Sequence, residues 1–365
     1  MATRPSPARA GPVLASLPRP SLPAPTTLAV VSDPHLAPDA RGTWKVLHRA
    51  PGRFRAALAD ADRRGVDAVL SPGDLTKDGA PAEFALVDEA LADEALADRS
   101  TPFLAVPGNH DVPKPRWDPY EAPSAGAFAE RYGPGSLPFA ERVGGLDVVG
   151  LNSASAPDGS LCDTHEGAVG SVQLDWLDRT LPDLETPVVC LHHGVTHPSA
   201  RTGSGGFAGA GGDGVGGDGD GAGRDGGHYR VRDADALHEV LVRHDVPLVV
   251  SGHVHWPDVA PVGAGHELVA PATCSLPPSY LLLHVDDRGT TVELVPLAGR
   301  TGFEEAYVSA REGNAHGRAV AANAVSSGVV DDLLLAAEAG LPPSAYRLDA
   351  EGRRPGRADV DGGAP

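Results

Sequence analysis

Short apolar runs alternate along the chain with longer stretches in which apolar residues return every three or four positions. Brief runs of Val, Leu and Ala between turn residues are typical of strands buried on both faces. Such runs occupy residues 27–31, 67–70, 103–106, 187–191 and 247–250. Helical spacing occurs in residues 53–65, 82–98, 172–181 and 233–245. This alternation predicts an α/β fold with βαβ units around a largely parallel sheet, covered by helices on both faces.

Each predicted strand leads into a polar segment that carries carboxylate, amide or imidazole groups. In open α/β sheets the functional site lies beyond the carboxyl ends of the strands, so residues far apart in the sequence can meet there. In chain order the segments contain Asp33 with His35, Asp74, Asn109 with His110 and Asp111, His192 with His193, and His253 with His255. We therefore expect these side chains to converge at one edge of the sheet.

These residue types suit two divalent metal ions. Two ions held about 3.5–4 Å apart form a clamp for in-line attack at phosphorus, and a water between them becomes hydroxide near neutral pH. We expect Asp74 to bridge the ions, because a shared carboxylate can hold them that close. One ion would be bound by Asp33, His35 and His255, and the other by Asn109, His192 and His253. Such ligands fit Mn, Fe, Zn or Co, and the sequence does not choose among these metals.

The third segment also holds two catalytic candidates. His110 follows a ligand but faces another direction if its backbone is extended, so we expect it to donate to the leaving oxygen or to stabilise phosphoryl charge. Asp111 would orient the His110 ring. In the fourth segment, strand alternation turns only one ring of the pair His192 and His193 towards the metals.

The order of these segments resembles the calcineurin-like metallophosphoesterase superfamily. The motifs that carry the resemblance are Asp-x-His, Gly-Asp, Gly-Asn-His-Asp, His and Gly-His-x-His. The resemblance implies a four-layer α/β/β/α sandwich of two mixed sheets flanked by helices, with a dinuclear metal site at the strand ends. It favours His192 over His193 and implies a catalytic role for His110. The metal ligands that it implies are Asp33, His35, Asp74, Asn109, His192, His253 and His255.

Three more apolar runs follow the last metal histidine. They occupy residues 266–270, 280–285 and 290–295, and residues 286–289 provide a hairpin turn between the last two runs. We expect these antiparallel strands to finish the second sheet.

Details of the second segment indicate a subgroup. Residues 73–79 read Gly-Asp-Leu-Thr-Lys-Asp-Gly, which is similar to bacterial cyclic-AMP phosphodiesterase-like members of class III. Lys77 replaces the Tyr of purple acid phosphatases, and Gly194 replaces a Pro that many relatives have beside the substrate pocket. The expected function is a phosphodiesterase that hydrolyses a small soluble phosphodiester such as a cyclic nucleotide. The alternatives are a phosphomonoesterase of the same superfamily and a non-catalytic metal-binding scaffold.

Charge and cysteine content narrow the partners and the compartment. The formal net charge is −19 with histidine neutral. Such a surface repels polyanions, so we expect no long nucleic acid as a partner and disfavour a DNA-repair exonuclease. Three cysteines (Cys162, Cys190 and Cys274) have no CxxC spacing, and their odd number favours reduced thiols in the cytoplasm. No apolar run approaches the length that spans a bilayer, so no membrane partner is expected.

Composition also predicts the domain organisation. Residues 1–25, rich in Pro, Ala, Arg and Ser, are expected to form a disordered arm. The metallophosphoesterase domain is expected over residues 26–300, with a flexible Gly-rich insert at 202–227. Residues 301–349 are expected to be an Ala-rich, partly helical extension that packs on the domain or mediates a homodimer. Residues 350–365 are expected to form a disordered tail.

Five other residues each have two interpretations. His165, His48 and His197 are either solvated histidines or members of the site rim. Asn152 follows another predicted strand and either caps it or contacts substrate. Trp256 either packs in the core or offers a surface for base stacking.

Overall fold

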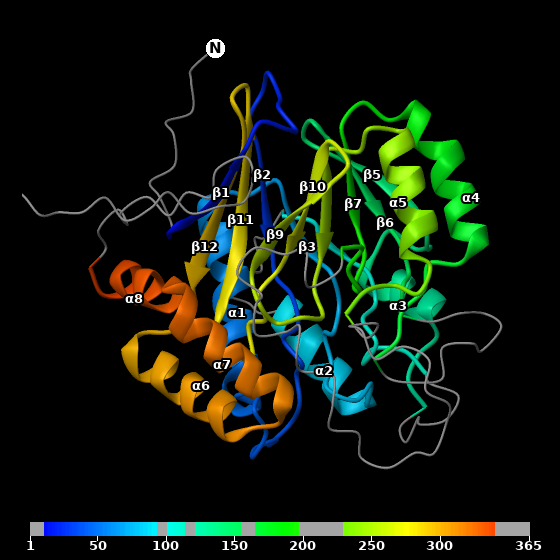
Figure 1. Cartoon of the computed structure of the whole chain (residues 1–365). Helices are drawn as coiled ribbons and strands as arrows, with labels where there is room; N and C mark the ends of the chain where they lie inside the picture. Colours follow the sequence, from blue (N-terminus) through cyan, green and yellow to red (C-terminus); the bar gives the residue numbers. More distant parts are fainter. Residues whose placement is uncertain (1–10, 93–100, 114–120, 155–164, 197–228, 340–365) are drawn as a thin grey trace, which may run out of the picture.

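The computed structural model of the chain describes residues 11–92, 101–113, 121–154, 165–196 and 229–339. Two six-stranded sheets pack face to face (Figure 1). In spatial order the first sheet contains β1 (Val13–Leu17), β12 (Gly289–Pro296), β11 (Ser279–Asp286), β2 (Thr26–Val30), β3 (Ala68–Ser71) and β4 (Phe103–Ala105). The second contains β5 (Phe139–Val143), β6 (Leu146–Gly150), β7 (Pro187–Cys190), β8 (Leu248–Ser251), β10 (Gly265–Val269) and β9 (Asp258–Val262).

The predicted parallel strands are present but divided between the two sheets. In the first sheet β2, β3 and β4 are parallel, and in the second β6, β7, β8 and β10 are parallel. Antiparallel strands complete both sheets, so each sheet is mixed. The sandwich of two mixed sheets is thus confirmed, and the expectation of one largely parallel sheet is corrected.

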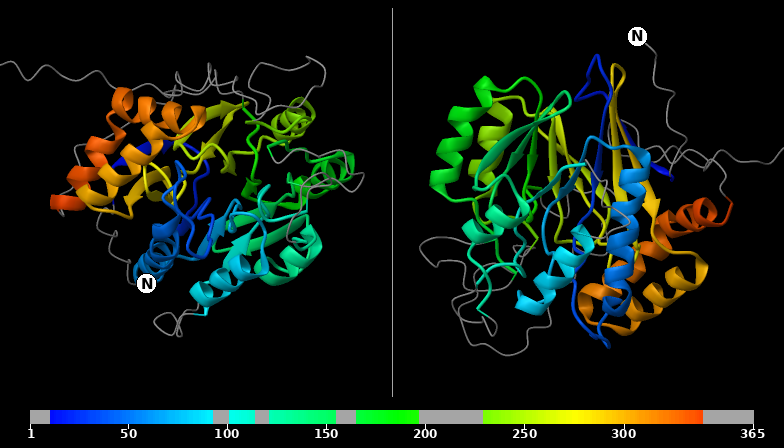
Figure 2. Two further views of the ribbon diagram at one scale, coloured as in Figure 1. Left: turned by 90° about the horizontal axis from the view of Figure 1, so that it is seen from below. Right: turned by 180° about the vertical axis from the view of Figure 1, so that it is seen from behind.

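Helices cover the outer face of each sheet. The first sheet is covered by α1 (Ala50–Arg64), α2 (Pro81–Leu91) and α3 (Ala125–Tyr132), whose Phe54, Phe84 and Phe128 are buried against it. The second sheet is covered by α4 (Ser171–Thr180) and α5 (Ala234–Arg243). Figure 2 shows α1 and α2 in the view from behind, whereas α4 and α5 flank the other sheet in Figure 1. Two short 3-10 helices, η1 (Leu47–Arg49) and η3 (Leu181–Asp183), adjoin α1 and α4.

The largest core lies between the sheets and continues under three C-terminal helices. These are α6 (Arg300–Glu312), α7 (Ala315–Ser327) and α8 (Val329–Ala339). Phe303, Val320 and Leu333 from these helices belong to the same buried cluster as Val292 and Leu294 of β12. Burying apolar side chains of this size stabilises the fold by about 1.5–3 kcal/mol each. The helices therefore close one side of the inter-sheet core.

Two expectations, one about the N-terminal residues and one about the last three predicted strands, are wrong. Residues 11–25 do not form a disordered arm, because Val13–Leu17 pairs with β12 as the edge strand β1 and its apolar side chains are buried. Among the last three predicted strands, only residues 266–270 join the second sheet, as β10 parallel to β8. The hairpin of β11 and β12 instead completes the first sheet beside β2. Pairing partners of this kind are set by long-range packing, which the local pattern does not record.

Several expectations fall on other parts of the chain. Residues 1–10, the insert at 202–227, the tail at 350–365, His197 and Cys162 lie outside the described residues. Within the described part, no single helix combines the length and apolar character needed to cross a membrane. The bent pair of α7 and α8, at 74° to each other, meets that test on length and composition alone.

Candidate metal centre

The polar segments leave the carboxyl ends of β2, β3, β4, β7 and β8 and meet between the two sheets. The sheets join there, because Ser32 and Ala272 form a parallel bridge just beyond β2 and β10. Left-handed φ angles occur at many of the ligand candidates. They are 50° at Asp33, 44° at His35, 53° at Asp74, 68° at His253 and 60° at His255. Non-glycine residues adopt such angles rarely, and they cluster at functional sites where the surroundings hold them.

Three side chains form a compact group that we name the second half-site: Asn109, His192 and His253. Asn109 Oδ1 lies 2.9 Å from His192 Nε2 and 3.1 Å from His253 Nδ1. The two ring nitrogens are 3.2 Å apart. All three polar atoms therefore face a common point, and each comes from a different loop.

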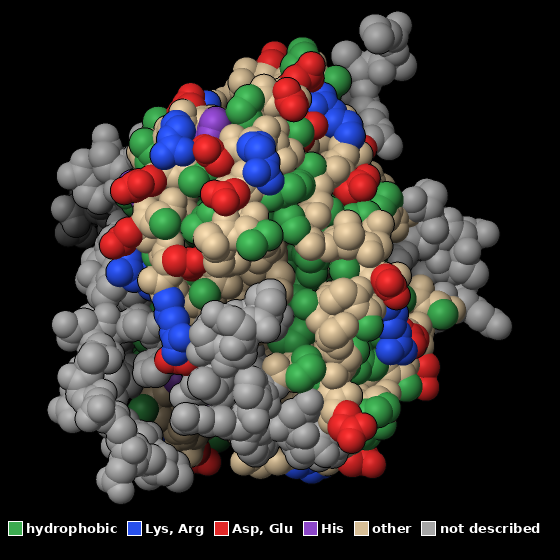
Figure 3. All heavy atoms as spheres, turned by 90° about the vertical axis from the view of Figure 1, so that its right-hand side faces the viewer, with side chains coloured by type: hydrophobic (Ala, Val, Ile, Leu, Met, Phe, Trp, Pro, Cys, Tyr) green, Lys and Arg blue, Asp and Glu red, His purple; other side chains and the backbone are tan. Residues whose placement is uncertain are grey.

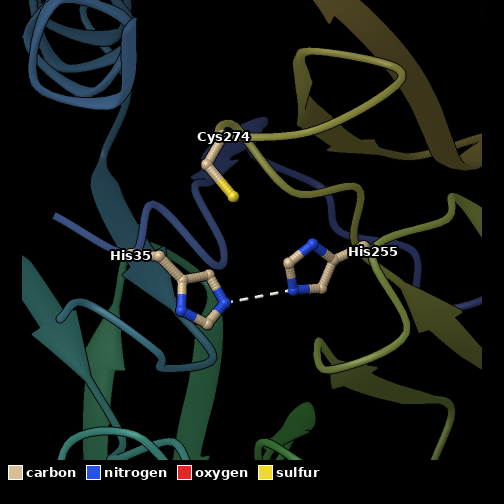
Figure 4. A group of neighbouring side chains, drawn as sticks. All are labelled: His35, His255 and Cys274. Atoms are coloured by element: carbon tan, nitrogen blue, oxygen red, sulfur yellow. Dashed lines mark hydrogen bonds between the residues drawn. The ribbon is translucent and has the colours of Figure 1, made fainter. Parts of the chain in front are cut away.

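The first half-site contains Asp33, His35 and His255. The Nε2 atoms of His35 and His255 are 3.1 Å apart and point towards one another (Figure 4). Asp33 Oδ1 lies 3.8 Å from His35 Nε2 and 3.3 Å from His255 Nε2. This oxygen is buried and meets the geometry of no hydrogen bond among the described residues. A buried oxygen of that kind is a ligand atom suited to a cation.

Asp74 connects the two half-sites. Its Oδ2 atom lies 3.4 Å from Nε2 of His35 and 3.4 Å from Nε2 of His192. Its other oxygen, Oδ1, accepts a hydrogen bond from the backbone N–H of His110 at 2.9 Å. Atoms that share one ion at about 2.0–2.2 Å lie roughly 3.0–3.4 Å from each other. Nearly all the separations in both half-sites are close to that range, so the donor set fits two metal ions with a shared carboxylate.

A close approach of two loops explains one motif glycine. At Gly108 a Cβ atom would collide with the carboxylate and the backbone N of Asp74. Only glycine therefore allows the loop that carries Asn109 to lie directly against the bridging carboxylate.

Outer contacts fix the orientation of the ligand rings. The carbonyl of Pro72 lies 2.9 Å from Nδ1 of His192, and Ser275 Oγ lies 3.0 Å from Nδ1 of His255. Such partners set which ring nitrogen carries a proton and leave the other nitrogen for a metal. In both rings the nitrogen left for a metal is Nε2.

Charge in the cluster is balanced by protonation. Burial would raise the pKa values of Asp33 and Asp74, but nearby imidazoles lower them below the ordinary value, so both are carboxylates. Burial lowers the pKa values of His35 and His253 well below the ordinary range, so these rings are neutral. Burial also opposes a charge on His192, but the charge and hydrogen bond of Asp74 raise its pKa to about 9. His192 is therefore the imidazolium of the cluster at neutral pH.

The catalytic candidates have different surroundings from those expected. The Nδ1 atom of His110 donates to the carbonyl of Lys77, and its ring centroid lies 4.8 Å from that of His35. Burial lowers the pKa of His110 to about 4. Asp111 does not orient this ring. Its two oxygens instead accept hydrogen bonds from the backbone N–H groups of Leu75, Thr76 and Gly108 and from the Thr76 hydroxyl. Asp111 thus joins the Asp74 loop to the Asn109 loop.

His193 also lies beside the second half-site, with its ring centroid 4.5 Å from that of His253, and it forms a possible metal-binding group with His192 and His253. His193 points to Ser153, whose Oγ lies 3.0 Å from Nδ1, so His192 is the member of the pair that faces Asp74. His165 is exposed, and after burial it is a minor contributor to the lowered pKa values of His110 and His253.

Three other candidates have structural contacts. His48 Nε2 lies 2.9 Å from Glu305. The Asn152 backbone pairs with Gln173, and its side chain accepts from Ala154. Trp256 is buried in the core between the sheets.

Sequence reasoning missed two side chains in the first half-site. Lys45 Nζ lies 2.9 Å from Nε2 and 3.3 Å from Nδ1 of His35. The thiol of Cys274 points towards the gap between His35 and His255 (Figure 4). Cys274 follows β10, a predicted strand whose carboxyl end reaches the site, so its position offered a signal. Lys45 lies in a loop that carries no such signal.

A comparison of the sequence with models of known protein families gives a match that includes the candidate metal centre. A sequence model described as calcineurin-like phosphoesterase matches residues 26–257. The chain belongs to the calcineurin-like phosphoesterase family. The match includes all seven ligand candidates, and family membership makes the protein a hydrolase of phosphoric esters. A similar protein of Synechococcus sp., named a probable cyclic nucleotide phosphodiesterase, is 25% identical over 275 residues, covering 72% of this chain and 89% of the relative.

Two solved phosphatase structures share the fold. A dimetal phosphatase from Danio rerio aligns with a TM-score of 0.50 and 14% identity, covering 75% of this chain and 99% of that one. A purple acid phosphatase from yellow lupin aligns with a TM-score of 0.50 and 13% identity, covering 77% of this chain and 53% of that one. At such low identity these similarities concern the fold, and they agree with the two-sheet sandwich described above.

Proposed function

We propose that this calcineurin-like phosphoesterase is a dinuclear metal-dependent phosphodiesterase that hydrolyses a small soluble phosphodiester such as a cyclic nucleotide. The observation that carries the proposal is the position of Asp74 Oδ2, at 3.4 Å from a ring nitrogen of each half-site. A shared carboxylate is what two ions about 3.5–4 Å apart require. The similarity to a probable cyclic nucleotide phosphodiesterase supports the substrate class.

In this proposal the two half-sites hold one ion each. Asp33, His35 and His255 would hold the first ion, Asn109, His192 and His253 would hold the second, and Asp74 would contribute to both. Mn, Fe, Zn or Co would fit the nitrogen and oxygen ligands. When bound, two such ions supply positive charge at the phosphoryl group and activate water for attack. The protein's part is to hold the ligands apart at fixed spacing in a buried, water-poor site.

His110 would act on the substrate side of this cluster. Because its Nδ1 donates to the Lys77 carbonyl, Nε2 is the nitrogen available to the substrate. A ring nitrogen of His110 lies within 4.8 Å of ligand atoms of His35 and Asp74. The neutral ring can accept a proton when an anionic phosphoryl group is bound, and it then stabilises the charge that develops on the phosphoryl oxygens.

The surface charge supports a small substrate. On the side of the molecule that carries α4 and α5, basic side chains are interspersed with acidic ones (Figure 3). Arginines in and next to α5 pair with carboxylates, as Arg243 does with Asp178 and Arg232 with Glu166. A continuous basic track, which long nucleic acid requires, is therefore interrupted on this face.

The buried free thiols of Cys190 and Cys274 are consistent with a reducing, cytoplasmic location.

One observation favours a second candidate, a phosphomonoesterase. Lys45 adds a side-chain cation beside His35. A phosphomonoester carries two negative charges near neutral pH, one more than a diester, so an added cation would favour it. The two activities use the same metal centre and differ in the charge of the preferred substrate.

The test compares two model substrates on metal-reconstituted full-length protein. We expect hydrolysis of bis(p-nitrophenyl) phosphate with a higher kcat/KM than that of p-nitrophenyl phosphate, and loss of both activities with a chelator. Asp74→Asn keeps the side-chain shape but removes the charge that both ions share, so kcat/KM should fall about a thousandfold. Asp78→Asn is the matched control on the same loop, because the Asp78 carboxylate pairs with Lys77.

The outcomes separate the candidates. A higher kcat/KM for the monoester would replace the diesterase by the phosphomonoesterase. Full activity in Asp74→Asn, or activity that persists without metal, would refute the dinuclear site itself.

A further inference from the structure

The C-terminal helices reach the loop that carries two ligand candidates. His316, on the first turn of α7, donates from Nε2 to the backbone carbonyl of Val254 at 3.1 Å. Val254 is buried between His253 and His255, which belong to different half-sites. The family match ends at residue 257, so this contact comes from a part of the chain that the family model does not cover.

The contacted loop has a strained backbone. His253 and His255 both have left-handed φ angles, 68° and 60°. Such a conformation costs about 1–3 kcal/mol per residue and persists only where the surroundings hold it. Two hydrogen bonds from the family domain hold the loop, from Gly252 N–H to the His192 carbonyl at 3.0 Å and from His253 N–H to Asp33 at 3.2 Å. The His316 bond to the Val254 carbonyl is a further contact with this loop, and it comes from outside the family match.

Trp44 connects the same helix to the ligand ring itself. Its ring centroid lies 4.9 Å from that of His255 and 4.9 Å from that of His316. Trp44 is thus packed between a metal-ligand candidate and α7. The close approach requires glycine in the helix, because a Cβ atom at Gly317 would crowd the Trp44 side chain. The hydroxyl of Tyr229 lies 3.3 Å from Nδ1 of His316 and completes the surroundings of the ring.

We propose that His316 is a positioning residue for the metal centre, which holds the His253–His255 loop in its ligand-presenting conformation. This inference rests on the metal site of the proposed function. In this role His316 acts through the Val254 carbonyl and through Trp44. Residues that orient metal ligands from outside typically change metal affinity about 10–100-fold when replaced. The C-terminal helices are therefore part of the metal centre as well as of the fold.

The test measures metal binding, which does not depend on knowing the substrate. Full-length, metal-stripped protein is titrated with Mn²⁺ by calorimetry, and the Co²⁺ absorption spectrum reports the ligand geometry. His316→Phe keeps an aromatic ring beside Trp44 but has no donor for the Val254 carbonyl. We expect Mn²⁺ binding to weaken about tenfold or more in this variant and the Co²⁺ spectrum to change. His316→Gln, which retains an N–H donor, should recover part of the affinity.

Glu305→Gln is the matched control, because it loosens the same C-terminal helices at a different place. Glu305 on α6 accepts from His48 Nε2 at 2.9 Å and from Arg49 Nε at 3.1 Å, away from the ligand loop. We expect its Mn²⁺ affinity to match that of the wild type. An equal loss in Glu305→Gln and His316→Phe, or wild-type affinity in His316→Phe, would overturn the positioning role. Absence of Mn²⁺ binding in the wild type would instead contradict the proposed function.

Discussion

The two half-sites differ in how they balance the negative charge of their carboxylates. In the second half-site the positive charge resides on a ligand, because Asp74 and its hydrogen bond raise the pKa of His192 to about 9. In the first half-site the ligand rings are neutral, and the cation is the side chain of Lys45, with Nζ 2.9 Å from His35 Nε2. Both arrangements place a positive group where a metal ion would bind. Buried carboxylates need such compensation when no metal is bound.

This difference implies that a metal ion displaces a different group in each half-site. A metal that binds Nε2 of His192 must displace a proton from that nitrogen. A metal that binds Nε2 of His35 must displace the amino group of Lys45, whose Nζ lies 2.9 Å from that nitrogen. We therefore expect the affinity of the second half-site to depend on pH and that of the first to depend on Lys45.

The largest expected effect comes from removing one half-site at a time. Asp33→Ala removes a proposed ligand of the first half-site and also the carboxylate that accepts from the His253 N–H. Asn109→Ala removes a proposed ligand of the second half-site. Each variant should bind one metal ion instead of two and should lose about a thousandfold in kcat/KM, because in-line attack needs both ions. Metal content by mass spectrometry of dialysed protein and rates with bis(p-nitrophenyl) phosphate check this prediction.

Loss of both ions in either variant would show that the two half-sites do not bind metal independently. If both variants kept two ions, the assignment of ligands to half-sites would be wrong. The single-ion proteins are also the tools for the two predictions that follow.

The ligand candidates could be predicted because their signal is local. Each lies within a few residues of a short buried strand, as Asp33 does after β2 and His192 does after β7. Parallel strands present their carboxyl ends at the same edge, so the convergence of distant segments follows from the pattern alone. The motif order then distinguishes His192 from His193, and the structure turns these two rings to different partners.

What could not be predicted depends on contacts between distant, unpatterned segments. Lys45 and Trp44 lie in a loop without strand or helix spacing, and His316 lies on a helix with a weakly apolar face. Nothing in their local sequence indicates that they meet at His35 and His255. The same limit applies to β1 (Val13–Leu17), whose strand conformation depends on pairing with β12. The role of Asp111 was misjudged because backbone N–H groups, which sequence does not reveal, became its partners.

The second prediction concerns pH and the second half-site. In Asp33→Ala, which keeps only that half-site, Asp74 still raises the pKa of the metal-free His192 ring, but the contribution of Asp33 is lost, so this pKa lies below the value of about 9 in the intact protein. Binding at Nε2 releases one proton, so the affinity for Mn²⁺ should rise about tenfold per pH unit up to the pKa of His192 in this variant and level off above it. Calorimetry in buffers of different ionisation enthalpy measures the released proton directly.

The matched comparison is Asn109→Ala, which keeps only the first half-site. The pKa values of His35 and His255 are lowered by burial, so these rings need no deprotonation near neutral pH. Its affinity should change much less between pH 6.5 and 8.5 than that of Asp33→Ala. A steeper pH dependence in Asn109→Ala than in Asp33→Ala would reverse the comparison between the half-sites.

The smallest expected effect belongs to Lys45. Lys45→Met keeps the length of the side chain but cannot donate to His35 Nε2, so the metal no longer competes with an amino group for that nitrogen. A hydrogen bond with a charged partner contributes about 1.5–3 kcal/mol, so Mn²⁺ should bind the first half-site about tenfold more tightly in Lys45→Met than with Lys45 present. The full gain in Mn²⁺ affinity should be measured in the Asn109→Ala background, which keeps the first half-site. No gain should be measured in the Asp33→Ala background, which keeps only the second. Lys77→Met controls for the loss of a lysine, because Lys77 pairs with Asp78 instead of His35. If Lys45→Met weakened Mn²⁺ binding, Lys45 would be a support of the first half-site and not a competitor for it, and the two half-sites would differ less than their charges indicate.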